Sequence, residues 1–142
     1  MIMLLQKRIL TAVLVSLTLV LSLSGCGKKS AVQQLQEAIE RSSKQLPQRV
    51  DAATTWTVAR YDRAANEIVF EYSFLQNVSL QEDDLALMHQ MMCGQIMTAF
   101  AGDGEEMVSL IRKVRPNVRY IFRWAGDGHI LIDDTCRPEE YL

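Results

Sequence analysis

Two histidines mark the places in this chain where acid–base chemistry could occur. His129 lies two residues after Asp127 and shortly before Asp133 and Asp134. A histidine beside a carboxylate can act as a general acid–base pair. Asp127 belongs to a Gly-Asp-Gly turn, however, and no serine or cysteine has the local sequence of a known nucleophile motif. We therefore interpret His129 as an exposed hairpin residue, and we expect no catalytic residues and no enzymatic activity.

His89 belongs to the densest group of soft metal ligands, which also contains Met88, Met91, Met92 and Cys93. Thioether and thiol groups favour Cu(I), and His89 and Met92 would share a helix face at a spacing of three residues. Methionine is also a common filler of irregular cores, and Cys93 is better used in a disulfide. We expect core packing here, with no bound metal or cofactor.

A basic cluster surrounds Pro116 and consists of Arg112, Lys113, Arg115, Arg119 and Arg123. Cations are favourable near the C-terminal end of a helix, so part of this cluster has a purely local explanation. Arg119 and Arg123 would share one face of a strand, and a half-polar face of this kind can be covered by a partner. We predict a weak docking patch at Arg115, Arg119 and Arg123, for an acidic partner or for lipid headgroups.

The first 25 residues have the three-part layout of a secretory signal. Lys7 and Arg8 form a short positive region, residues 9–23 are almost wholly apolar, and two small residues follow. A spanning helix needs roughly 20 apolar residues to cross the hydrocarbon layer. Because the apolar run here is only about 15 residues long, a permanent transmembrane helix is the less favoured interpretation.

The signal ends in Leu23-Ser24-Gly25-Cys26, which resembles the lipobox of bacterial lipoproteins. The resemblance covers residues 1–26 only. It implies that Cys26 carries a diacylglycerol group, that residues 1–25 are removed, and that the new amino terminus receives a further acyl chain such as palmitate. Two or more acyl chains hold a protein stably at a membrane, whereas one chain binds only marginally. The alternative is an ordinary secretory signal followed by a chance cysteine.

Gly27 follows the cysteine that would carry the lipid. In the enterobacterial members of that family, an aspartate at this position tends to retain the protein in the inner membrane. The resemblance therefore favours the outer membrane, with the domain facing the periplasm, and leaves the inner membrane as the alternative.

If Cys26 carries lipid, the remaining cysteines are Cys93 and Cys136, an even pair in an oxidising compartment. We predict that they form a disulfide. Such a bond would close a loop of roughly 44 residues and stabilise the fold by about 4 kcal/mol in the chain-entropy model. The alternative is two buried thiols.

The chain after the signal has 117 residues, enough for one domain with a single modest core. It carries 13 basic and 17 acidic residues, a net charge of −4 that argues against nucleic acid as a partner. We predict a signal peptide at 1–25, a short lipid-anchored tether at 26–30, and a single α+β domain at 31–142.

The domain is expected to begin with a helix and a β-hairpin. Ser30 is suited to cap the helix, and Pro47 would end it. Its apolar stripe consists of Val32, Leu35, Ala38, Ile39, Ser42 and Leu46. Residues 55–62 and 67–75 are expected to be antiparallel strands, the first with Trp56 and Val58 on one face. The second alternates with the period of a half-buried strand through Ile68, Phe70, Tyr72 and Phe74.

One or two helices and a second hairpin are expected to follow. Ser79 and Glu82 have the spacing of a capping box, so a helix should start there and run to about residue 101. Its buried stripe would be Leu85, Met88, Met92, Ile96, Ala99 and Phe100. A shorter helix at 105–114 would precede strands at 118–124 and 129–134, joined by a Gly-Asp-Gly turn.

This order of elements predicts a four-stranded, mainly antiparallel sheet with helices on one face. Small lipid-anchored α+β domains often act as accessory factors of envelope machines. By that analogy, we expect a non-enzymatic interaction or assembly module of the bacterial envelope with a protein partner. The alternative is a lipoprotein that binds a small ligand or a metal.

Overall fold

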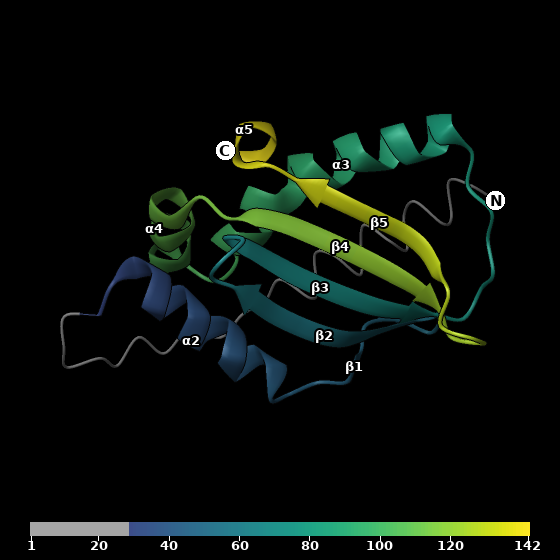
Figure 1. Cartoon of the computed structure of the whole chain (residues 1–142), viewed down its shortest axis with the longest axis horizontal. Coiled ribbons are helices and arrows are strands. Elements are labelled where there is room, and N and C mark those ends of the chain that lie inside the picture. The colour runs from purple at the N-terminus through teal and green to yellow at the C-terminus, as the bar shows by residue number, and fades with distance from the viewer. Residues whose placement is uncertain (1–28) are drawn as a thin grey trace.

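The computed structural model describes residues 29–142 (Figure 1). The expected signal peptide, the lipid site at Cys26 and most of the tether lie outside these residues. Within 29–142, no helix combines the length and the apolar character that crossing a membrane requires.

The domain has the predicted α+β class and the predicted order of a helix, strands, helices and strands. In chain order the elements are α2 (Ala31–Ser43), β1 (Gln48–Arg49), β2 (Thr54–Asp62), β3 (Glu67–Phe74), α3 (Glu82–Ala101), α4 (Glu105–Val114), β4 (Asn117–Trp124), β5 (Ile130–Cys136) and α5 (Pro138–Tyr141).

The sheet has five strands in the order β1-β2-β3-β4-β5 (Figure 1). All neighbouring pairs are antiparallel except β3 and β4, which are parallel. The prediction of four mainly antiparallel strands is therefore wrong: the sheet is mixed and has one more strand. The parallel pair is possible because α3 and α4 form a long crossover between β3 and β4. The additional strand, β1, has two residues, too few to show an alternating pattern.

One face of the sheet packs against α2, α3 and α4, and this layer is the core. The alternating residues of β3 face it as predicted, and Tyr72 stacks on Phe122 of β4 with ring centroids 4.6 Å apart. The helices contribute Leu35 and Ile39 from α2, Met92 and Ile96 from α3, and Met107 and Ile111 from α4, all nearly inaccessible to solvent. We call the opposite side the second face of the sheet.

A β-bulge in β2 changes the predicted facing of its residues. The register with β3 shifts between Trp56 and Val58, which leaves Thr57 without a partner. Trp56 therefore shares the core face with Ala59, and Val58 lies on the second face. A bulge inserts one residue into a strand and reverses the alternation of its side chains beyond that point. The sequence-based prediction assumed strict alternation along β2 and therefore placed Val58 on the wrong face.

The helix ends also differ from the predictions. Ser30 caps α2 by accepting a hydrogen bond from the Gln33 N–H, as predicted, but α2 ends at Ser43, three residues before Leu46. Gln81, not Ser79, is the residue before α3, and its N–H donates to Asp84. Leu85 is 40% exposed and lies outside the buried stripe predicted for α3.

Candidate functional site

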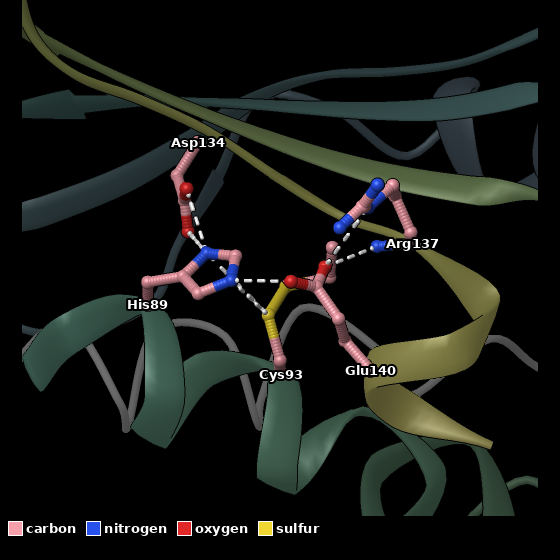
Figure 2. The surroundings of a disulfide bond; sticks show 6 residues. His89, Cys93, Asp134, Arg137 and Glu140 are labelled. Atoms are coloured by element: carbon pink, nitrogen blue, oxygen red, sulfur yellow. Dashed lines mark hydrogen bonds and ion pairs between the residues drawn. A yellow bond between two sulfur atoms is a disulfide. The ribbon is translucent and has the colours of Figure 1, made fainter. Parts of the chain in front are cut away.

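A disulfide between Cys93 of α3 and Cys136 at the end of β5 is the centre of a dense polar cluster (Figure 2). The predicted pairing of these cysteines is thus present in the structure. His89 lies one helical turn before Cys93, so both side chains project from the same face of α3. Asp134 lies two residues before Cys136, so both project from the core face of β5. Glu140 of α5 completes this group, which we call the His89 cluster.

The His89 ring lies between two carboxylates (Figure 2). Its Nδ1 is 2.7 and 2.8 Å from the two carboxylate oxygens of Asp134, and its Nε2 is 2.9 Å from Oε1 of Glu140. The Cys93 sulfur lies 3.6 Å from Nε2 and 3.7 Å from Nδ1. Since both nitrogens face acceptors, the doubly protonated ring satisfies both contacts at once.

The electrostatics of the cluster favour this charged ring. Burial is the largest single influence on the pKa of His89 and acts to lower it, but hydrogen bonds and attraction from Glu140 and Asp134 outweigh burial. The net pKa of His89 is raised above its ordinary value. The pKa of Glu140 is lowered, first by the backbone N–H of Arg137 and then by His89. The cluster therefore joins α3, β5 and α5 through ion pairs beside the disulfide.

Two of the three methionines near His89, Met88 and Met92, have the core role predicted for them, whereas Met91 is only half-buried. Met88 and Met92 are 3% and 2% exposed and pack among the other core residues. The link from His89 to Asp134 and Glu140 was not predicted. Asp134 and Glu140 lie 45 and 51 residues from His89 in the sequence. The only sequence feature that pointed to the cluster was the spacing of four residues between His89 and Cys93, which puts both on one face of a helix.

His129 is exposed on the turn between β4 and β5, as interpreted from the sequence. Its backbone N–H and Nδ1 lie 2.9 and 2.6 Å from Oδ1 of Asp127, and its ring contacts Trp124 at a centroid distance of 5.6 Å. The backbone N–H of His129 is the main cause of the lowered pKa of Asp127. Asp134, by contrast, lies in the His89 cluster, so the fold does not bring it to His129.

Arg119 and Arg123 lie on the second face of the sheet, in ion pairs. Nε and Nη2 of Arg119 donate to the two oxygens of Asp133 at 2.8 and 2.6 Å. Nε of Arg123 donates to Glu71 at 2.9 Å. Within the described residues, the charges of both arginines are therefore matched by carboxylates of neighbouring strands.

Arg115 lies elsewhere, at the left-handed residue that follows α4. It lines an open pocket of about 330 Å³ together with Met97, Arg112 and Leu142. The three arginines predicted to form one docking patch thus belong to two surfaces, and their role in partner binding stays a prediction.

Comparison with known proteins gives two similar structures. No family model and no curated protein match the chain. A Pseudomonas aeruginosa protein described as secreted has 10% identity and a TM-score of 0.49, covering 82% of this chain and 100% of its own. The type II secretion system pilotin AspS from Vibrio cholerae has 12% identity and a TM-score of 0.49, covering 78% of this chain and 91% of its own. Neither likeness is close enough to transfer a function.

Proposed function

We propose that this protein is a lipid-anchored periplasmic protein of the bacterial envelope, and that it acts as a non-enzymatic interaction or assembly module. The lipobox-like sequence that ends at Cys26 supports the anchor, and Gly27 favours the outer membrane. The placement of exposed apolar side chains at one end of the domain supports the interaction role.

A short tether would hold the domain close to the membrane. Helix α2 begins at Ala31, five residues after Cys26, and Ser30 already caps it. Five extended residues reach at most about 17 Å. The start of α2 lies beside α4 at one end of the domain (Figure 1), so this end would face the bilayer.

The opposite end carries the apolar surface. Strands β3 and β4 end there, and α3 and β5 begin there (Figure 1). Four of the large apolar side chains that are exposed come from these element ends: Leu75 (61%), Leu85 (40%), Leu87 (47%) and Ile130 (47%). Single exposed leucines are common, but several exposed apolar side chains at one end of a domain support an interaction role.

Contacts and register relate two of these residues to the neighbouring strand ends. The Trp124 indole donates to the carbonyl of Leu75 at 3.4 Å, and Ile130 pairs with Arg123 in the sheet. Along α3 and β5, His89 faces Asp134. Because a helix rises about 1.5 Å and a strand about 3.3 Å per residue, Leu85 is level with Ile132, the third residue of β5. We call Leu75, Leu85, Leu87 and Ile130 the apolar end.

Photo-crosslinking in intact cells tests this proposal. A photoreactive amino acid in place of Leu87 should give one adduct of fixed mass, because a docked partner would cover the apolar end. The same probe in place of Glu40, an exposed residue of α2, should give no such adduct. Leu85→Asp should remove the Leu87 adduct while lipid attachment at Cys26 is unchanged. The same adduct from both probe positions, or a smear of many masses, would count against a docking end.

A small-ligand function is the second candidate because of the pocket at Arg112 and Arg115. Two guanidinium groups beside Met97 and Leu142 suit an anion that has an apolar part. Native mass spectrometry of the detergent-extracted protein tests this candidate. A bound small molecule should be seen with the wild type and lost with Arg112→Glu, whereas identical spectra for the two proteins would exclude it.

A further inference from the structure

We propose that reduction of the disulfide converts the His89 cluster into a zinc site, with Cys93, Cys136, His89 and Asp134 as its ligands. This inference does not depend on the proposed envelope function. It rests on the types of the four side chains, their spacing on α3 and β5, and the distances between their ligand atoms.

The four ligand atoms lie within 4.8 Å of one another. Two come from α3 at a spacing of four residues, and two come from β5 at a spacing of two, so all four project into the gap between helix and strand. Zinc prefers four ligands in a tetrahedron, with bonds of about 2.3 Å to sulfur and about 2.0–2.2 Å to nitrogen or oxygen. Ligand atoms so close together need only side-chain adjustment to surround one ion.

Burial at the cluster suits a partly enclosed metal site. Cys136 and Cys93 are 0% and 4% exposed, so their sulfur atoms are shielded from bulky molecules. The side chains of His89 and Asp134 are 32% and 25% exposed. A small ion can therefore enter past the imidazole and the carboxylate to reach the sulfur atoms.

A dithiol is the reductant that converts the disulfide into the zinc site. The dithiol gives two electrons and two protons to the disulfide and becomes a disulfide itself, which leaves two thiols at Cys93 and Cys136. Zinc then displaces both thiol protons, and these go to solvent together with any proton that Nδ1 of His89 carries. The ion takes a position between Nδ1 of His89 and the carboxylate of Asp134.

Glu140 has a positioning role in this arrangement. It is 2.9 Å from Nε2 of His89, which keeps its proton when Nδ1 binds the metal. A carboxylate that holds the second ring nitrogen of a zinc-bound histidine fixes the ring orientation and raises its basicity.

Zinc titration of the full-length chain in detergent tests the proposal. The protein carries Cys26→Ser so that Cys93 and Cys136 are its two cysteines, and it is reduced, freed of reductant and kept under argon. The reduced protein should bind one zinc per chain, at least about 100-fold more tightly than the oxidised protein, because thiolates are the main ligands. Cobalt(II) should give a thiolate charge-transfer band with the reduced protein alone.

Variants of the two histidines and of two neighbouring aspartates separate the site from non-specific binding. His89→Ala and Asp134→Asn should each weaken zinc binding about tenfold or more. His129→Ala and Asp133→Asn, their matched controls outside the cluster, should leave the affinity unchanged. Far-UV circular dichroism of each reduced variant reports whether it is folded.

Three results would overturn the zinc site. One is a reduced, folded protein that binds no zinc. Another is His89→Ala or Asp134→Asn binding as tightly as the wild type, since zinc would then be held by the thiols alone. The third is a reduced wild type that unfolds and does not regain its dichroism when zinc is added.

Discussion

The Arg119 guanidinium lies against the Asp133 carboxylate on the second face of the sheet, with two parallel hydrogen bonds between them. Such bidentate pairs are the stronger kind of surface ion pair. Hydrogen bonding from Arg119 is the main cause of the lowered pKa of Asp133, and it outweighs the opposing effect of burial. At the scale of single residues, Arg119 and Arg123, two of the three arginines predicted to bind a partner, pair with carboxylates of the sheet, and their role in partner binding stays a prediction.

This pair makes stability depend on pH in the acid range. Because the pKa of Asp133 in the folded state lies below its ordinary value of 3.8, the pair contributes fully above that pH and is lost as pH falls through the folded-state pKa. Arg119→Gln should return the pKa of Asp133 towards 3.8, as measured by NMR titration of its carboxyl group. Arg60→Gln, an exposed arginine of β2, is the control. An unchanged Asp133 pKa in Arg119→Gln would contradict the assignment.

At the scale of elements, the spacing of apolar and charged residues predicted where the helices and strands lie in the sequence, but it did not predict how they are arranged in space. Helix 105–114 has the predicted bounds because its acidic start, apolar face and basic end agree. Strand β3 alternates as expected except at Val69, which is also buried, because one of its faces lies in the core. The parallel pairing of β3 with β4 depends on where the two-helix crossover returns, and the bulge at Thr57 depends on its partner strand. Neither is encoded in the spacing of apolar residues.

Asn66 joins the β2–β3 turn to the end of α4. Its side-chain amide donates to the carbonyls of Val114 and Arg115 at 3.0 and 3.2 Å, its Oδ1 accepts from the Tyr61 hydroxyl, and its φ is +49°. Asn66→Ala should lower the free energy of unfolding by about 2–3 kcal/mol, since it loses hydrogen bonds worth about 1 kcal/mol each and strains a left-handed residue.

Asn66→Gly separates these two effects, because glycine adopts the left-handed conformation without strain. It should be destabilised by about 1 kcal/mol less than Asn66→Ala in urea denaturation. Equal stabilities of the two variants would show that strain has no part, and a wild-type-like Asn66→Ala would contradict the joining role.

The disulfide joins the middle of α3 to the last residue of β5, across 43 residues of sequence. Replacing both cysteines with serine should lower the free energy of unfolding by about 4 kcal/mol, because the unfolded chain is then no longer restrained. Urea denaturation measures this loss. Cys26→Ser, which leaves the disulfide intact, should have no effect on the domain, and a loss below about 1 kcal/mol in the double variant would contradict the structural role.

At the scale of the whole molecule, the domain has two ends with different surfaces. The start of α2 and the end of α4 lie at the end that the tether would hold near the bilayer, and the apolar end lies opposite (Figure 1). Counting cysteines was enough to predict the disulfide. The His89 cluster was not predictable in this way, because Asp134 and Glu140 reach His89 only when β5 and α5 pack beside α3.

The intact mass of the protein extracted from envelopes with detergent tests the central claim most directly. A chain that begins at Cys26, carries acyl groups and lacks two hydrogens for the Cys93–Cys136 disulfide is the expected result. Cys26→Ser should remove the acyl groups and leave the disulfide in place. A wild-type mass that includes residues 1–25, or a chain that begins at Cys26 with an unmodified thiol, would contradict the lipid anchor.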